Sequence, residues 1–480
     1  MNLAKNHRFP SPQFVIQLTD HHLMFNSPHF RQLVRKPANL LAIAFCVVAM
    51  LSACAFASDQ IPGAKQSKPI LIRGATIHTV AGPTIESGSI LLKDGKIAEI
   101  AANIPLSDGY QVIEAAGKHV YPGLIDSFSS MGLIEIDSVR ATIDNSETGN
   151  INSNVKAAVA FNPDSEAIPV GRANGILTSI VTPAGGLIAG RASAMMLDGW
   201  TWEDMTLKAD VAMAINWPRF GGGGGGPGGG GRGRFRGQDA GEGEEADNDR
   251  LAALHELFRE TRAYATAKKA DPSGTAVDLR LEAMIPVVEG KLPMLVNANL
   301  LKQIQTAVAF GQQYGVKMII VGGADAIHCA QLLVDTQTPV IVPSTYRLPT
   351  RRDAGYDAAY ALPSQLKAAG IKVAIASDGR FGASMVRNLP YHAATAVGFG
   401  LSEEDAVRCI TLTPAEIFGV SDRIGSLEVG KDATLILTDG NVLEIASNVQ
   451  SAFIQGRAVD LSSKHTRLND KYKTKYERMK

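Results

Sequence analysis

Cysteine is scarce in this chain of 480 residues, which contains only four. Two of them, Cys46 and Cys54, lie near the N-terminus, while Cys329 and Cys409 are far apart and show no CxxC spacing. This distribution argues against a disulfide framework or a zinc–thiolate site and predicts two buried thiols in the body of the protein.

Neither sign of charge is in excess, because 47 Lys and Arg residues balance 47 Asp and Glu residues. We therefore expect no global attraction for nucleic acid or for an anionic membrane.

The most apolar stretch, residues 40–51, is shorter than the roughly 20 residues that a membrane-spanning helix needs. Three basic residues, Arg31, Arg35 and Lys36, precede this stretch, and small residues follow it. A basic flank, a short apolar core and small residues are together typical of a secretory signal peptide. We therefore expect residues 1–57 to form a signal peptide and the mature protein to be exported.

Two processing sites compete at the end of this signal. Leu51-Ser52-Ala53-Cys54 resembles a lipobox, in which Cys54 becomes a diacylated N-terminus, whereas Ala55-Phe56-Ala57 fits ordinary cleavage before Ser58. The first site predicts an outer-membrane lipoprotein, and the second predicts a protein of the bacterial periplasm. The membrane contact expected from the sequence is a lipid anchor on Cys54.

The mature chain divides into a central region flanked by short β-rich stretches. Residues 68–119 include an Asp94-Gly95 hairpin signal, and residues 425–462 are β-rich as well, so we expect the two ends to form a small composite β-sandwich. Between them, residues 120–424 alternate strands with helices, which predicts an α/β fold with a (β/α)8 TIM barrel. The expected barrel strands are residues 120–126, 176–182, 194–197, 212–215, 293–298, 317–322, 340–343 and 372–378.

A glycine-rich insertion at residues 219–250 interrupts this alternation. Residues 221–226 and 228–231 are all glycine, and glycine at this density favours a flexible loop because ordering it costs much backbone entropy. The Arg-Gly segment that follows superficially resembles an RNA-binding stretch, but acidic residues directly after it neutralise its charge. We therefore expect no nucleic-acid partner. Residues 463–480 form a charged tail.

Four sequence blocks follow one another along the chain. The first is Tyr121-Pro122-Gly123-Leu124-Ile125-Asp126. The others are Ala374-Ile375-Ala376-Ser377-Asp378, Thr411-Leu412-Thr413-Pro414-Ala415-Glu416-Ile417-Phe418-Gly419, and Gly425-Ser426-Leu427-Glu428-Val429-Gly430-Lys431-Asp432-Ala433-Thr434-Leu435. In this order the blocks resemble the amidohydrolase superfamily and, within it, the imidazolonepropionase-like branch. The first is similar to the family's P-G-[LF]-I-D-x-H-x-H strand, and in the last Thr434 replaces the usual aspartate.

The resemblance implies hydrolysis of amide or cyclic amide C–N bonds by a divalent metal, which activates water and polarises the carbonyl. Of the implied ligand set, Asp378 alone is present, and it is the catalytic candidate. The positions of the four ligand histidines and of the fourth-strand ligand correspond to Phe128, Ser130, Asn297, Gly322 and Asn216. One carboxylate with amides and a hydroxyl is inadequate for zinc. We therefore predict no metal ligand, and the cofactor is unknown.

Other candidates lie beyond the barrel strands. Arg351 and Arg352 follow the seventh strand, where guanidinium groups suit a substrate carboxylate, although a solvated charge cluster explains them equally well. His328 and His392 lie on neighbouring segments, where packing or solvent exposure is the favoured role. Trp200 and Trp202 after the third strand are expected to pack a loop rather than stack on a ligand.

Two functions follow from these observations. The first is an exported hydrolase of non-peptide amide bonds, with an atypical centre around Asp378. The second is a catalytically silent barrel that binds a small molecule or supports an active relative. The expected partners are a small-molecule substrate or ligand, and either further copies of the chain or an active relative.

The glycine-rich insertion yields the first testable prediction. Because a glycine-rich loop offers extended backbone to a protease, limited trypsin digestion of the native protein is expected to cut first between Arg232 and Arg250. Mass spectrometry of the early fragments identifies the site. Early cleavage elsewhere, with this stretch intact, would contradict the prediction.

Overall fold

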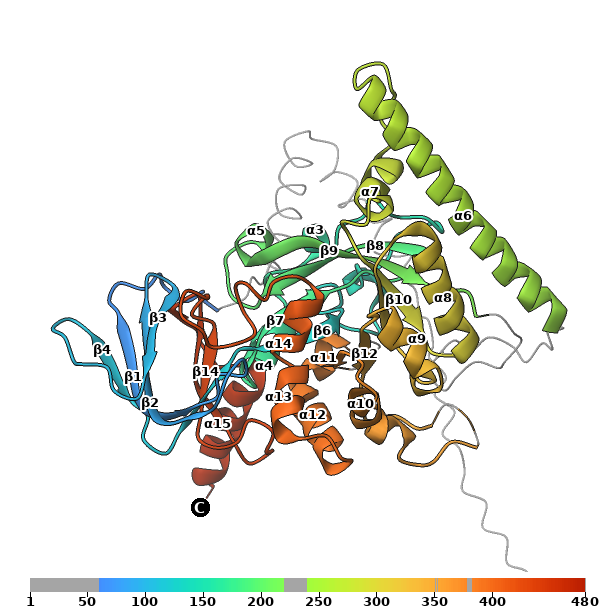
Figure 1. Cartoon of the computed structure of the whole chain (residues 1–480). Helices are drawn as coiled ribbons and strands as arrows, with labels where there is room; N and C mark the ends of the chain where they lie inside the picture. Colours follow the sequence, from blue (N-terminus) through green and yellow to red (C-terminus); the bar gives the residue numbers. More distant parts are fainter. Residues whose placement is uncertain (1–59, 220–239, 350, 352, 378–381, 480) are drawn as a thin grey trace, which may run out of the picture. The chain divides into compact units, whose positions relative to one another are not determined.

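An eight-stranded sheet that rolls into a nearly closed barrel forms the centre of the computed structural model (Figure 1). The structure describes residues 60–219, 240–349, 351, 353–377 and 382–479. The sheet order follows the sequence: β6 (Leu124–Ser129), β7 (Ile176–Val181), β8 (Ile188–Met196), β9 (Thr206–Asn216), β10 (Met294–Ala298), β11 (Met318–Gly322), β12 (Val340–Pro343) and β13 (Val373–Ala376). Each of the eight expected strands overlaps one of these, so the predicted barrel class is confirmed.

The third strand differs from the expected βα unit in its direction. β8 runs antiparallel to both β7 and β9, whereas the other neighbouring pairs are parallel. The link between β7 and β8 is too short for the crossover of a dozen or more residues that a parallel return requires. The loop after β8 therefore lies at the amino end of the parallel strands, away from the barrel mouth.

The two chain ends together form a separate sheet, in the region where a small composite β-sandwich was expected. Its strands are β1 (Ile70–Ile77), β2 (Ile85–Lys93), β3 (Lys96–Ala101), β4 (Gln111–Glu114), β5 (His119–Pro122), β14 (Leu435–Thr438), β15 (Val449–Ile454) and β16 (Arg457–Ala458). β5 joins the two halves because it pairs with β1 on one side and with β14 on the other. Asp94 and Gly95 both have positive φ in the tight turn between β2 and β3, which is the backbone that their hairpin signal predicted.

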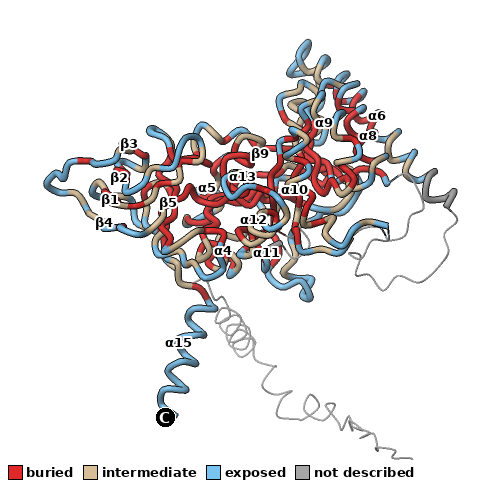
Figure 2. The backbone as a smooth tube through the Cα atoms, turned by 60° about the horizontal axis from the view of Figure 1, so that its bottom comes forward, coloured by how far each residue is buried: buried red, intermediate tan, exposed pale blue. Residues whose placement is uncertain are grey.

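Helices and short 3-10 turns connect the strands. They are η1 (Arg140–Thr142), α3 (Ala157–Ala160), α4 (Ala167–Arg172), α5 (Trp202–Met205), α6 (Ala240–Ala270), α7 (Leu279–Val288), α8 (Leu301–Tyr314), η2 (Ala326–Cys329), α9 (Ala330–Asp335), α10 (Ala358–Ala368), α11 (Gly382–Met385), η3 (Val386–Asn388), α12 (Leu389–Gly398), α13 (Glu403–Cys409), α14 (Leu412–Ile417) and α15 (Lys464–Glu477). Among the described residues, no helix is both long and apolar enough to cross a membrane. Buried residues concentrate in the barrel, and α15 is exposed along its length (Figure 2).

The structure changes one part of the predicted glycine-rich insertion. Residues 220–239 of the insertion lie outside the described residues, but α6 begins at Ala240, so the last third of the expected loop is helical. The Ala-, Leu- and Glu-rich sequence that follows favours helix and extends it over the preceding glycines.

Cys329 and Cys409 are buried and free, and burial raises the pKa of their thiols to about 11 and about 12.

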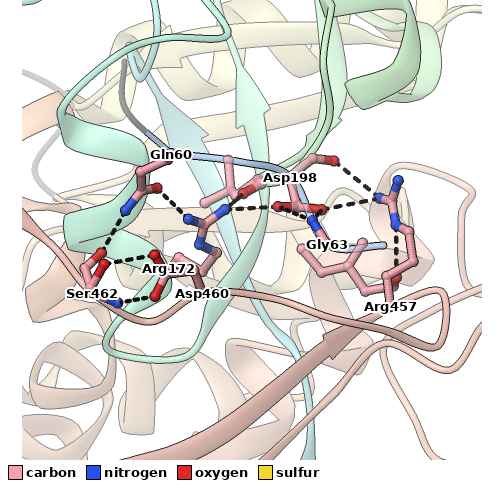
Figure 3. A network of polar contacts seen from close by, with 9 residues as sticks. Gln60, Gly63, Arg172, Asp198, Arg457, Asp460 and Ser462 are labelled. Carbon is pink, nitrogen blue, oxygen red and sulfur yellow. Dashed lines mark hydrogen bonds and ion pairs between the residues drawn. The ribbon is translucent and has the colours of Figure 1, made fainter. Parts of the chain in front are cut away.

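A buried ion pair at the amino end of the barrel connects the two chain ends to it (Figure 3). Arg172, at the end of α4, donates from Nη1 to Asp198 Oδ1 at 3.0 Å, and both side chains are almost fully buried. The backbone N–H of Gly63 donates to Asp198 Oδ2 at 3.1 Å, and Arg457 Nη2 donates to the Asp198 carbonyl at 3.1 Å. Gln60 accepts from Arg172 and donates to the Ser462 carbonyl at 2.6 Å.

This network yields a stability prediction. Asp198→Ala is expected to lower the free energy of unfolding by about 3 kcal/mol, because the Arg172 guanidinium loses the carboxylate that compensates its burial. Urea denaturation followed by circular dichroism measures the change. Glu114→Ala, which breaks the exposed ion pair with Arg73, is the matched control and should leave the midpoint nearly unchanged. Equal losses in the two variants would contradict a special role for the buried pair.

Candidate functional site

The barrel mouth lies where the carboxyl ends of the parallel strands meet, together with the amino end of the reversed strand β8. Active sites of TIM barrels occupy this end, because the loops that follow the parallel strands converge there. The described residues at or just beyond these strand ends include Ser130, Asn216, Asn297, Gly322 and Ser377. All of them are small or neutral.

Asp126 holds the first and eighth strands together at the seam of the barrel. Its Oδ1 accepts the backbone N–H of Ser377 at 2.9 Å, and its Oδ2 accepts the Ser377 hydroxyl at 2.6 Å. The neighbouring Ser127 hydroxyl donates to the Ile375 carbonyl at 3.1 Å. Asp126 is fully buried; burial raises the pKa of its carboxyl to about 6, and the hydrogen bonds from Ser377 act in the opposite direction. The Asp126 carboxylate therefore holds together two of the strands that form the mouth.

The two residues at the first-strand histidine positions offer no metal ligand. Phe128 is partly buried and packs against the barrel core. Ser130 is buried, and its hydroxyl has no hydrogen-bond partner among the described residues. An aromatic ring beside a lone hydroxyl supplies neither the charge nor the imidazole that zinc requires.

Two amides face each other across the fourth and fifth strands. Asn216 and Asn297 occupy the same register of β9 and β10, and Asn297 Nδ2 donates to Asn216 Oδ1 at 3.5 Å. Asn216 Nδ2 in turn donates to the carbonyls of Gly185 at 3.2 Å and Gly186 at 3.0 Å. Asn297 is exposed to solvent. The pair presents neutral donors and acceptors in place of a carboxylated lysine and a histidine.

The sixth-strand position is closed to a larger side chain. Gly322 ends β11 with φ of +105°, a conformation that L side chains rarely adopt. A Cβ at this residue would lie only 2.8 Å from Asn299 Cγ. The buried Oδ1 of Asn299 has no hydrogen-bond partner among the described residues. Gly322 is therefore required by the local packing, and a histidine there needs both Asn299 and the backbone to move.

Two predicted site residues, Asp378 and Arg352, lie outside the described residues. Arg351 is described, and its Nη2 lies 3.3 Å from Oδ1 of the buried Asp325 and 3.2 Å from His328 Nε2. These residues line a pocket of about 340 Å³ between the segments that follow β11 and β12. The structure therefore brings Arg351 and His328 together, but an internal carboxylate already engages the guanidinium. Its assignment to a substrate carboxylate stays a prediction.

The other candidate side chains have packing roles. His392 is buried in α12, where its Nδ1 lies 3.2 Å from the Thr345 hydroxyl and its ring packs on Tyr346. Trp202 packs against the barrel core, whereas Trp200 is exposed. Because β8 is reversed, the loop that contains both tryptophans lies at the amino end of the barrel and not at the mouth.

The described residues do not fit the metal centre that the resemblance implies. Within residues 60–219, 240–349, 351, 353–377 and 382–479, no group of three or more His, Cys, Asp or Glu side chains is arranged to hold a metal ion. The side chains at the mouth are hydroxyls and amides, which are weak ligands for zinc, and Asp126 is occupied by Ser377. We therefore derive no catalytic step through a metal.

Comparison with solved structures shows that the chain has the fold of amidohydrolase barrels. An amidohydrolase from Thermotoga maritima MSB8 superimposes with a TM-score of 0.69 at 23% identity, covering 82% of this chain and 99% of that one. Molinate hydrolase superimposes with a TM-score of 0.52 at 14% identity, covering 84% and 96% of the two chains. At these identities the likeness shows the fold, that of amidohydrolase barrels with an attached sheet domain.

Sequence comparison makes the assignment more specific. The amidohydrolase family model matches residues 333–459. Imidazolonepropionase from Syntrophobacter fumaroxidans is 39% identical over 82 residues, which are 17% of this chain and 19% of that protein. The match thus spans about a fifth of the curated relative's length. Residues 333–459 match the amidohydrolase family and the chain has the fold of its barrels, so the predicted resemblance to the amidohydrolase superfamily is confirmed.

Sequence reasoning missed Asp126 and Asn299 as residues that shape the mouth. A signal for Asp126 was present, because an aspartate within the apolar strand Leu124-Ile125-Asp126 must find hydrogen-bond donors when it is buried. No comparable signal pointed to Asn299. Its contact with Gly322 depends on how β10 and β11 lie side by side.

The raised pKa of the buried Asp126 carboxyl predicts that the stability of the fold depends on pH. Because the folded-state pKa of Asp126 is raised to about 6, the buried carboxyl favours folding when protonated, and this contribution is lost as the pH rises from about 4 to 6. Relative to Asp126→Asn, which cannot titrate, the parent should lose roughly 3 kcal/mol of stability over this range. Urea denaturation of both proteins at several pH values measures the difference. A difference that does not change with pH would contradict the raised pKa.

Proposed function

We propose that this chain is an exported amidohydrolase-superfamily protein whose barrel mouth binds a small amide-bearing molecule without a histidine metal centre. The observation that carries the proposal is Gly322, since its backbone conformation and its contact with Asn299 exclude an imidazole at a position where the family places a ligand. A simple substitution at this position would therefore not restore the usual site.

The proposed ligand class follows from the side chains that remain at the mouth. Asn297 offers a donor and an acceptor that complement an amide group, and Asn216, whose amide is engaged by Gly185, Gly186 and Asn297, holds it in place. Asn297 is exposed, and its Oδ1 has no hydrogen-bond partner among the described residues, so it is free to accept from a ligand N–H. Neutral groups of this kind favour a small uncharged amide, such as a lactam or a hydantoin, over an anion.

The alternative function is hydrolysis of amide C–N bonds by an atypical centre around Asp378. It is supported by the match of residues 333–459 to the amidohydrolase family, because Asp378 lies within that match. The two functions make opposite predictions about metal content and turnover, so one set of measurements separates them.

The test combines metal analysis with ligand binding. Protein produced in medium containing zinc, manganese and iron is expected to contain less than stoichiometric metal. Hydantoin or 2-pyrrolidinone should raise its melting temperature without being hydrolysed. Asn297→Ala is expected to weaken ligand binding about tenfold, because one hydrogen bond to the ligand is lost. Asn248→Ala, on the exposed surface of α6, is the matched control and should bind as the parent does.

Two outcomes would overturn the binding proposal. Stoichiometric metal that disappears in Asp378→Ala, together with turnover of a lactam, a hydantoin or a dipeptide, would establish the hydrolase. Equal loss of binding in Asn297→Ala and Asn248→Ala would place the ligand elsewhere than at the mouth.

A further inference from the structure

The C-terminal helix α15 has a segregated surface that the function of the barrel does not explain. All residues of Lys464–Glu477 are exposed, and none packs into the protein core (Figure 2). Ser463 caps the helix: its hydroxyl accepts the Thr466 backbone N–H, and its own N–H donates to the Thr466 hydroxyl. The helix contacts α4, but none of its side chains is buried, so most of its surface is open to a partner.

One side of α15 is apolar and aromatic. Leu468, Tyr472 and Tyr476 follow one another at intervals of four residues, which places them within an arc of about 80° on the helix. They are 40%, 48% and 60% exposed, so no other described part of the protein covers them. Single exposed apolar residues are ordinary, but a continuous stripe on one helix marks a contact surface.

Basic side chains form a second stripe directly beside the first. Lys464, Arg467, Lys471 and Lys475 lie within an adjoining arc of about 80°. The only two acidic residues of the helix, Asp470 and Glu477, fall on the opposite side.

The lysines of this basic stripe are available to a partner. Among the described residues, no carboxylate forms an ion pair with Lys464, Lys471 or Lys475. Lys475 Nζ instead lies 5.9 Å and 5.7 Å from the ring centroids of Tyr472 and Tyr476. Cations and phenol rings therefore meet along one edge of the helix.

We propose that α15 docks onto an anionic phospholipid surface, with its tyrosine stripe at the level of the headgroups and its basic stripe on the lipid phosphates. Phenol rings prefer the boundary between hydrocarbon and water, and long basic side chains bury their stems while their charges stay at the headgroups. A helix of strongly polar overall composition with these two faces lies in the interface plane rather than crossing the bilayer. The charge complementarity is local, because the whole chain has no net charge.

The position of α15 in the fold supports this partner. Gln60, the first described residue, donates to the Ser462 carbonyl, one residue before the cap of the helix (Figure 3). If Cys54 is acylated, its lipid is joined to Gln60 by six residues, a reach of at most about 20 Å. Such a lipid anchor would hold α15 close to the membrane, and two weak attachments at one place reinforce each other.

The test measures binding of the full exported chain to vesicles by sedimentation. The readout is the ratio of the Kd for neutral phosphatidylcholine vesicles to the Kd for vesicles that contain phosphatidylglycerol. An N-terminal anchor contributes to both values, so the ratio reports the electrostatic part. The ratio is expected to exceed 10 at low salt and to fall as salt is added.

Two matched triple variants test whether the preference for anionic vesicles comes from α15 or from lysines elsewhere on the surface. Changing Lys464, Lys471 and Lys475 to Gln should lower the ratio about 100-fold or abolish the preference, since each basic residue near an anionic surface contributes about fivefold. Gln preserves helix propensity, so α15 should persist. The control changes Lys68, Lys93 and Lys269, which are exposed and outside α15, to Gln and should keep the ratio of the parent.

A spectroscopic variant checks insertion at the headgroup level. Tyr472→Trp is expected to shift its fluorescence to shorter wavelength with anionic vesicles and not with neutral ones. The proposal is overturned if the parent shows no preference for anionic vesicles or if both triple variants lose it equally. It is also overturned if α15 forms a dimer with a second copy in the absence of lipid, or if duplex DNA displaces the vesicles.

Discussion

The Asp126 carboxylate is the contact on which the shape of the barrel mouth depends. The first and last strands of a barrel must meet, and here a side chain makes that connection by accepting two hydrogen bonds from Ser377. The carboxylate is fully buried, so these bonds offset a large desolvation cost, and its pKa remains raised in spite of them. The strand end that leads to Asp378 is positioned through this contact. In a metal-dependent relative the same frame would present ligands, whereas here it presents hydroxyls and amides.

The reversed strand β8 determines what each end of the barrel contains. A parallel third strand would have sent the loop with Asp198 to the mouth, where its carboxylate could join a functional site. The antiparallel β8 sends this loop to the amino end, where Asp198 pairs with Arg172 and receives the Gly63 N–H. Asp198 is therefore a structural anchor for both chain ends. The mouth is left with the neutral pair of Asn216 and Asn297.

The two proposals concern different parts of the molecule, the barrel mouth and α15. Amides at the mouth suit an uncharged ligand in a site that no strong charge dominates. The basic and aromatic stripes of α15 suit a surface, because they lie on an element that contributes nothing to the core. The network around Gln60 and Ser462 fixes the start of α15 at the amino end of the barrel, away from the mouth (Figure 3). Binding at the mouth and docking through α15 can therefore be tested independently.

The sequence by itself determined the strand positions, the family resemblance and which residues stand at the histidine positions of the motif. Strand positions follow from apolar runs and turn residues, and the Asp94-Gly95 turn follows from the positive φ values that these residues tolerate. The identities at positions 128, 130, 297 and 322 are read directly from motif spacing. These properties depend on residues that are close together in the sequence, so they can be predicted from the sequence alone.

Only the tertiary structure decided the direction of β8, the role of Asp126 and the closure of position 322. Side chains alternate between the two faces with a period of two residues in parallel and antiparallel strands alike. The apolar pattern of β8 therefore does not indicate in which direction the strand runs. The partners of Asp126 and Gly322 come from other strands, Ser377 from the eighth and Asn299 from the end of the fifth. Each of these contacts depends on the lateral register of distant strands, which is set when the barrel closes.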